Sequence, residues 1–155
     1  MPIDEGQGQV KEIGYRTATP ADADFVFRVV ETTMRVYNER QWGAFDVAGS
    51  KKVIGERIAA GTFEVIRFEG ADIGVLRVER HEGHIQLDQL FILPTHQNRG
   101  IGARIVRELA REARAAKKPL RLRVLEVNPA RKFYEREGFR VIATTPGRIH
   151  MELSE

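Results

Sequence analysis

Short runs of apolar residues alternate along the chain with stretches in which apolar residues recur at helical spacing. Seven runs favour strands: residues 10–17, 62–68, 73–79, 84–93, 120–127, 139–143 and 148–153. Four stretches favour helices: one that starts at Thr19–Pro20 and keeps helical spacing to Tyr37, and residues 51–60, 101–117 and 129–137. In the stretch 101–117, Ile105, Leu109 and Ala113 share one face, so this helix is expected to pack against a core.

The order of these elements predicts the fold class. Most of the strands follow one another through short connections, which favours antiparallel neighbours. The segments 84–93, 101–117 and 120–127 instead form a central strand–helix–strand unit. The sequence therefore predicts an α+β fold with a mixed, mostly antiparallel sheet of six to seven strands and helices on both faces.

Length and charge limit the classes of protein. The chain has 155 residues, which fits one domain, and we expect a flexible leader at residues 1–9 and a single domain at residues 10–155. No apolar run approaches the roughly 18 residues that a membrane-spanning helix needs, so we expect a cytoplasmic protein with no membrane partner. The formal net charge of +3 is too small to indicate nucleic acid as the main partner.

The inventory of reactive side chains excludes several chemistries. The chain has no Cys, which excludes disulfides, thiolate metal sites and a cysteine nucleophile. It has 4 His, too few and too scattered to favour a multi-histidine metal centre. Serine stands only at Ser50 and Ser154, and neither lies in the G-x-S-x-G motif of serine hydrolases. Most of the chemistry that remains for an enzyme needs no covalent enzyme intermediate.

A strand, a loop and a helix meet in the segment from Phe91 to Gly102, Phe-Ile-Leu-Pro-Thr-His-Gln-Asn-Arg-Gly-Ile-Gly. Small residues at the start of a helix let backbone N–H groups converge on an anion, and the helix dipole adds about half a positive charge. This arrangement suits a phosphate or pyrophosphate, although the two glycines could also serve only to make the turn. The segment matches neither a Walker loop nor the G-x-G-x-x-G dinucleotide motif, whose third glycine is replaced by Ile105.

Two motifs resemble the GCN5-related N-acetyltransferase (GNAT) superfamily. Gln97-Asn98-Arg99-Gly100-Ile101-Gly102 reads as [QR]-x-x-G-x-[GA], the acyl-CoA pyrophosphate loop of that superfamily. The stretch from Asn128 to Phe139 resembles its N-x-x-A-x-x-[FL]-Y-x-x-x-G-F motif, with one residue fewer between the Asn and the Tyr. The resemblance covers nearly the whole chain and is specific between Leu87 and Phe139. It implies a GNAT-type sheet, acetyl-CoA as the acyl donor, and no metal.

The resemblance also implies a role for each matching residue. The backbone of Phe91, Ile92 and Leu93 would pair with pantetheine, and one of these amides would polarise the thioester carbonyl. Asn128 would hydrogen-bond the CoA arm, Phe133 would contact it, and Tyr134 would protonate the departing thiolate. The pyrophosphate would lie against Gln97, Asn98, Arg99, Gly100, Ile101, Gly102 and Ala103.

The chemistry of acyl transfer gives Tyr134 and two carboxylates further support. A phenol close to a departing thiolate can donate a proton, although Phe133 and Tyr134 could also form a plain aromatic core pair. An amine near its ordinary pKa of about 10 must lose a proton before it attacks, and a carboxylate can remove it. Glu126, expected at the end of strand 120–127, is the first candidate base. Asp88, on the same strand parity as Leu90 and Ile92, is the second, and either could instead be solvated or ion-paired.

The expected function is acetyl-CoA-dependent N-acetylation of a primary amine on a small molecule or a peptide, by direct transfer in a ternary complex. A different acyl group, or a catalytically silent acyl-CoA-binding regulatory module, is the alternative. Nucleic-acid binding through a basic stripe is a third reading, which we do not favour because such a stripe is usually a solvated helix face; its residues are Arg104, Arg107, Arg111, Arg114 and Lys118. Tyr37, Trp42 and Phe45 are candidates for an acceptor wall, and free sheet edges are compatible with a homodimer.

Overall fold

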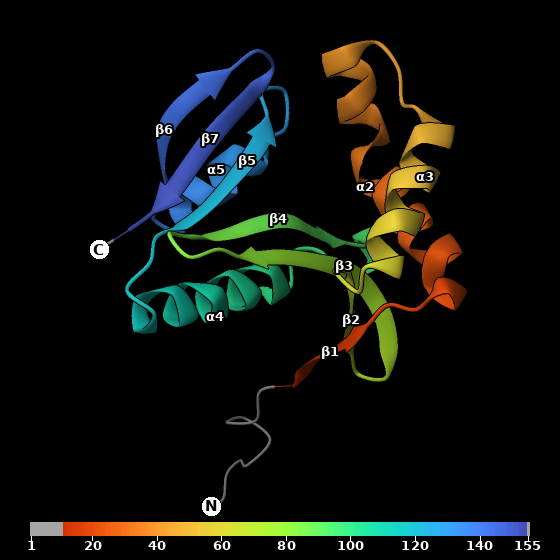
Figure 1. Cartoon of the computed structure of the whole chain (residues 1–155), viewed down its shortest axis with the longest axis horizontal. Coiled ribbons are helices and arrows are strands. Elements are labelled where there is room, and N and C mark those ends of the chain that lie inside the picture. Colours follow the sequence, from red (N-terminus) through yellow and green to blue (C-terminus); the bar gives the residue numbers. More distant parts are fainter. Residues whose placement is uncertain (1–10, 155) are drawn as a thin grey trace, which may run out of the picture.

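The computed structural model describes residues 11–154, and the leader expected at residues 1–9 lies outside them. The described chain forms one seven-stranded sheet in the order β1-β2-β3-β4-β5-β7-β6 (Figure 1). The strands are β1 (Ile13–Thr17), β2 (Glu64–Phe68), β3 (Ala71–Arg80), β4 (Ile85–Ile92), β5 (Leu120–Leu125), β6 (Arg140–Thr145) and β7 (Arg148–Leu153). Only β4 and β5 run parallel among these described strands. The predicted α+β fold with a mostly antiparallel sheet is confirmed.

Helices cover both faces of the sheet. The helices are α2 (Ala23–Trp42), α3 (Val47–Ala59), α4 (Ile101–Ala115) and α5 (Ala130–Arg136), with short 3-10 turns η1 (Pro20–Asp22) and η2 (Pro94–His96). One core joins α4 and α5 to one side of the sheet, through residues such as Ile105, Leu122 and Met151. A second core joins α2 and α3 to the opposite side, through residues such as Val29 and Val75. Figure 1 shows α4 along β3 and β4. It shows α2 and α3 at the right of the view, near the end of β4.

Side-chain caps set the starts of the first helices. Thr19 begins the helical region as predicted, and its backbone N–H donates to Asp22 Oδ2 at 2.8 Å. Helix α3 begins at Val47 and not at residue 51, because the Asp46 side chain accepts a hydrogen bond from Gly49 N at 2.9 Å. The prediction for this start was therefore wrong by one helical turn, since the apolar spacing gave no sign of the cap.

The feature that shapes the site is the separation of β4 from β5. The two strands pair only at Ile85–Leu120, Gln86–Arg121 and Leu87–Leu122. At Asp88, β4 carries a bulge, because Gln89 pairs with Arg77 while Leu87 pairs with Val78. Beyond this point the backbone edge of β4 has no strand beside it on the β5 side. The parallel pair therefore opens into a cleft at the C-terminal ends of its strands.

Candidate active site

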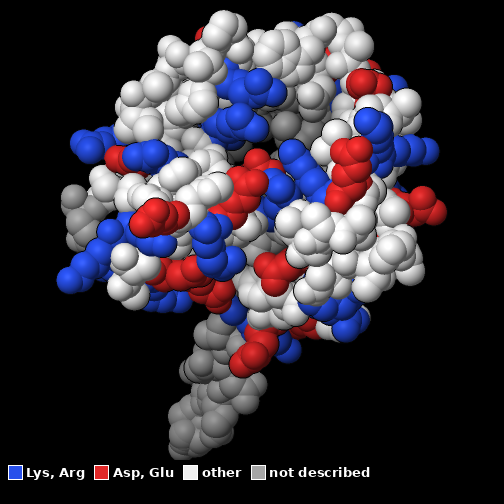
Figure 2. Space-filling model, in the orientation of Figure 1, with Lys and Arg blue, Asp and Glu red and all other residues white. Residues whose placement is uncertain are grey.

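A cavity of about 730 Å³ occupies the opening between β4 and β5. Its walls come from α2, the end of β4, the start of α4, the end of β5 and the start of α5. The lining includes Thr33, Met34, Tyr37, Arg57, Leu87–Ile92, Gln97, Asn98, residues 100–103, Leu122–Leu125, Asn128, Phe133, Tyr134 and Arg148. Figure 2 shows a hollow near the centre of this face, with charged side chains around it.

The start of α4 forms one end of the cavity. Gly100 caps the helix with a φ of 79°, and Asn98 before it has a φ of 62°, so two left-handed residues turn the loop into the helix. The first bond of the helix runs from Arg104 N to Gly100 O at 3.1 Å. The amides of residues 101–103 therefore have no acceptor within the helix and lie at the positive end of its dipole. This end of the cavity is suited to an anion.

The end of β4 presents backbone groups to the cleft. The amide of Leu93 donates to Ile73 O at 2.8 Å, so β3 already uses it. Because amides in an antiparallel ladder alternate in direction, those of Leu90 and Ile92 point away from β3. The Gln97 side chain returns to the same strand, where Nε2 donates to Ile92 O at 2.8 Å. Gln97 thus ties the loop to the strand edge, a contact that the sequence motif did not reveal.

Tyr134 lines the cavity and is buried, with 8% of its surface exposed. Its ring contacts Phe133 at 5.0 Å and Phe139 at 5.5 Å between centroids, both in edge geometry. No hydrogen bond joins its hydroxyl to another residue in the described part of the chain. Burial raises the pKa of this phenol, so it is protonated at neutral pH. The ring of Tyr134 therefore packs in the core, and the same residue also lines the cavity.

Asn128 connects the cavity to the beginning of α5. Its Oδ1 accepts from Ala130 N at 2.9 Å, a local turn that starts the helix. Its Nδ2 lies 3.8 Å from the Sδ atom of Met34 on α2. Nearby, Val127 N donates to Gln41 Oε1 at 3.3 Å. Helix α2 is therefore linked to the loop after β5, and the amide nitrogen of Asn128, which has two N–H groups, can still donate a further hydrogen bond.

The comparison with known families decides what this arrangement belongs to. A family profile described as acetyltransferase (GNAT) domain matches residues 59–141, more than half of the chain. The chain belongs to the GNAT acetyltransferase family. The match spans the elements from β2 to α5, which include the bulged strand, the glycine loop and Tyr134. The cavity is thus a candidate active site for acetyl transfer.

Solved structures share the GNAT fold at low sequence identity. The PaiA N-acetyltransferase from Thermoplasma acidophilum, in complex with coenzyme A, is 18% identical with a TM-score of 0.70, over 93% of this chain and 99% of that one. An acetyltransferase from Thermus thermophilus is 18% identical with a TM-score of 0.72, over 90% of this chain and 95% of that one. The yncA protein from Salmonella typhimurium, with its cofactor acetyl-CoA, is 20% identical with a TM-score of 0.58, over 92% and 94%. No curated protein matches the chain.

The two candidate bases differ in their places in this GNAT site. Asp88 lines the cavity and is ion-paired, with Oδ2 at 2.7 Å from Arg77 Nη1 and 3.5 Å from Arg57 Nη1. The bulge gives it this place, so the expectation that Asp88 shares a face with Leu90 and Ile92 is wrong, since those two pack on the α4 side. Glu126 is exposed, follows the end of β5 instead of standing on it, and is not among the lining residues.

Several lining residues were not predicted from the sequence. Arg57, Gln89, Arg123 and Arg148 all line the cavity on the side of α2 and α3. The only sequence signal was the alternation of arginines with leucines in the segment 120–125, which places Arg123 opposite the core face. Of the three expected wall aromatics, Tyr37 lines the cavity, while Trp42 and Phe45 do not.

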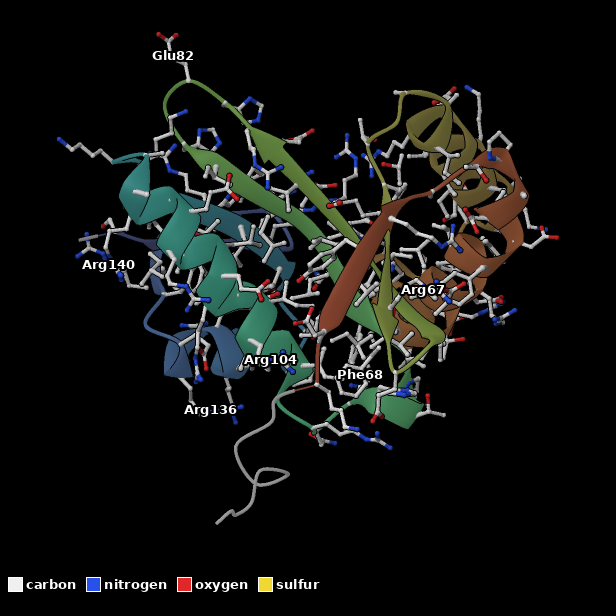
Figure 3. The ribbon with its side chains drawn as sticks, turned by 90° about the horizontal axis from the view of Figure 1, so that it is seen from below. Arg67, Phe68, Glu82, Arg104, Arg136 and Arg140 are labelled. Atoms are coloured by element: carbon white, nitrogen blue, oxygen red, sulfur yellow. The ribbon has the colours of Figure 1, made fainter. Side chains whose placement is uncertain are left out.

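The other charged motifs lie away from the cavity. On α4, Arg107 pairs with Glu137 at 2.9 Å, and Arg104, which Figure 3 shows near the start of β1, donates to Lys11 O at 2.6 Å. The expected basic stripe is thus divided by local partners. Between residues 11 and 154, no group of three or more His, Asp or Glu could hold a metal ion. Within the same residues, no helix is long and apolar enough to cross a membrane.

Proposed function

We propose that this protein is an acetyl-CoA-dependent N-acetyltransferase that transfers an acetyl group directly to a primary amine of a small molecule or a peptide. The observation that carries the proposal is that one cavity joins three parts: the start of α4, the free edge of β4, and the side chain of Tyr134. These parts suit a pyrophosphate, an extended amide-containing arm and a thioester, in that order. The domain would be residues 10–155.

Coenzyme A would lie between the separated ends of β4 and β5. The amides of residues 101–103 would hold the pyrophosphate, with the loop Gln97–Gly100 around it, because helix starts bind anions without a charged side chain. The arm would extend along the backbone edge of Leu90–Ile92, with Phe133 and the Asn128 amide nitrogen beside it. The coenzyme A complex of the Thermoplasma PaiA enzyme and the acetyl-CoA complex of the Salmonella protein support this choice of donor.

The residues around the thioester would then have separate roles in the reaction. The amide of Leu90 or Ile92 would donate to the carbonyl oxygen as negative charge develops on it. The amine nitrogen forms a C–N bond, the C–S bond breaks, and Tyr134 donates its proton to the sulfur. The proton that the nitrogen loses as it becomes an amide returns through water to the Tyr134 phenolate. The same desolvation that raises the pKa of Tyr134 also raises the proton affinity of a thiolate formed beside it. No cysteine is available for an acyl-enzyme route.

The proton of the ammonium group must leave before attack. Asp88 lies in the cavity, where its carboxylate is ion-paired with Arg77 at 2.7 Å. We propose that Asp88 acts on the amine through the water in the open cavity. Glu126, exposed beyond β5, would act only on a proton that has already reached solvent.

Release of free thiol from acetyl-CoA in the presence of an amine panel tests the proposal, with mass spectrometry of the acetylated amine. Tyr134→Phe is expected to lower kcat by about 10²- to 10⁴-fold, the range for a positioned acid, with little change in the Kd of acetyl-CoA. Tyr15→Phe is the matched control, because the Tyr15 hydroxyl bonds Glu108 at 2.9 Å and Tyr15 is not among the lining residues.

The alternatives give different results in the same assay. A silent acyl-CoA-binding module would be stabilised against heat by acetyl-CoA, more than by ATP or NAD, yet would release no thiol with any amine. A transferase for another acyl group would release thiol faster from that acyl-CoA. If acetyl-CoA does not stabilise this protein against heat, the result contradicts both the proposal and these alternatives.

A further inference from the structure

The side of the cavity that faces α2 and α3 is rich in arginine. Arg123 on β5 and Arg148 on β7 both line it, together with Arg57 on α3. In the β5–β7 register, Arg123 pairs with His150 and Leu125 with Arg148, so the two arginines occupy neighbouring diagonal positions on one face of the sheet. Figure 2 shows Lys and Arg side chains around the hollow on this face.

The arginines differ in whether the protein neutralises them. On the same face but outside the cavity lining, Arg121 pairs with Glu152 at 2.9 Å. Arg123 and Arg148 have no carboxylate partner among residues 11–154; the guanidinium of Arg148 lies 5.3 Å from the ring centroid of Trp42. Placing two like charges on adjacent strands without a counterion is unfavourable. The pair is therefore suited to an anion that the protein does not supply, because guanidinium groups match carboxylate and phosphate geometry.

Across the cleft from β5, the β4 strand offers a complementary group on the same side of the cavity. Gln89 on β4 lines the same cavity, and its side-chain oxygen Oε1 is buried and has no hydrogen-bond donor in the described chain. A buried acceptor without a donor is costly unless a ligand supplies one. The N–H group of an amine is such a donor. Asp88 beside it is already ion-paired with Arg77 and Arg57 and so does not neutralise Arg123 or Arg148.

We propose that the acceptor is an amine that also carries an anionic group, a carboxylate or a phosphate. Arg123 and Arg148 bind the anionic group, and the Gln89 side chain accepts a hydrogen bond from the nitrogen that is acetylated. This inference rests on the proposed function, since it names the acceptor class of the same cavity. The short sequence motifs do not show that Arg123 and Arg148 are neighbours, because the two arginines meet only through the pairing of β5 with β7.

The test uses acetyl-CoA with matched amines that differ only in the anionic group: L-amino acids against their amides, and O-phosphoethanolamine against ethanolamine. We expect kcat/KM at least about tenfold higher for the anionic member of a pair. The amino-acid and phosphate pairs separate the two sources of negative charge. Preference for the neutral members in both pairs would overturn the inference and leave the acetyltransferase proposal intact.

Variants locate the effect. Arg123→Gln and Arg148→Gln are each expected to raise the KM of the anionic amine about 10- to 100-fold and to leave the KM of acetyl-CoA unchanged. Arg121→Gln is the matched control, since Arg121 points to the same face and is not among the lining residues, and it is expected to change neither value. A rise in the KM of acetyl-CoA with Arg123→Gln or Arg148→Gln would assign these arginines to the coenzyme and overturn the inference.

Binding separates this inference from the proposed function. If acetyl-CoA binds but no amine is acetylated, the proposed function fails, and calorimetric titration of the same amine pairs into the CoA-saturated protein decides the inference. Tighter binding of the anionic members, lost in Arg123→Gln, supports an anion site. Equal or absent binding of both members overturns it. Unchanged thermal unfolding of each variant shows that it is folded.

Discussion

Gly100 and Gly102 lie two residues apart at the start of α4, yet the structure predicts opposite effects for the same substitution. Gly100 has a φ of 79°, and an added Cβ would have no atom within 4 Å, so Ala would suffer backbone strain without a clash. Gly102 has no such φ, and an added Cβ would be 3.7 Å from Ile92 Cδ1 and from Phe133 Cζ, which is ordinary contact. The loop pattern of the family also accepts Ala at this second position.

The magnitudes follow from this geometry. Both variants change Gly to Ala, so the effect on the unfolded chain is nearly the same and favours folding by about 0.4–1 kcal/mol. Ala at position 100 loses about 1–2 kcal/mol from the left-handed conformation. Ala at position 102 has no such strain in the folded state. We therefore expect Gly100→Ala to be less stable than Gly102→Ala by about 1–2 kcal/mol.

Urea unfolding of both variants and of the unchanged protein measures this difference, and titration with acetyl-CoA measures its effect on the site. Relief of strain in Gly100→Ala would turn the amides of residues 101–103 away from the cavity, so its Kd for acetyl-CoA is expected to rise. Gly102→Ala keeps these amides in place and its Kd is expected to change little. Equal stability of the two variants would refute the argument that φ at Gly100 sets the direction of these amides.

Two further predictions concern the charged pairs that support the site and its sheet. Hydrogen bonds from Arg16 and from the Thr19 amide lower the pKa of Asp22 from 3.8 to about 2, so its contribution to stability is present above the unfolded pKa and is lost as the pH falls toward 2. Asp22→Asn is expected to flatten the fall in unfolding free energy between about pH 4 and 2, and an unchanged slope would contradict this. Asp88→Asn leaves the buried Arg77 with Glu79, at 3.1 Å, as its acidic partner. Urea unfolding is expected to show that this variant loses about 1–3 kcal/mol of unfolding free energy. Glu79→Gln is expected to lose less, because Glu79 is the more exposed partner.

The elements with the strongest local signals were predicted well from the sequence. Helix α4 begins at Ile101, as predicted, because Gly100 precedes a regular apolar stripe. The glycine loop and Tyr134 were also predicted, since each lies in a short motif whose residues are close in the chain. In contrast, the start of α3 depends on one capping side chain, that of Asp46, and the spacing of the apolar residues does not reveal this cap.

The arginine-rich side of the cavity could not be predicted in the same way, because it depends on contacts between distant segments. The partner of Asp88 depends on the β3–β4 register and on a bulge that reverses strand parity. The proximity of Arg123 to Arg148 depends on the insertion of β7 between β5 and β6. Alternation along a strand predicts on which face of the sheet a side chain lies, but it does not predict which strand pairs with that strand.

The separation of β4 from β5 brings the residues of the local motifs and the arginines of β5 and β7 into one cavity. If the parallel pair continued past Leu87 and Leu122, its ladder would occupy the amides of Leu90 and Ile92, and the cavity would close. The bulge at Asp88 instead turns the strand where pairing stops, and gives consecutive residues, Asp88 and Gln89, to the cavity. The local motifs on the α4 side and the cross-strand arginines on the α2 side therefore meet in one space. In the proposed reaction, acyl donor and acceptor would then approach the same point from opposite faces of the sheet, as direct transfer without an acyl-enzyme would need.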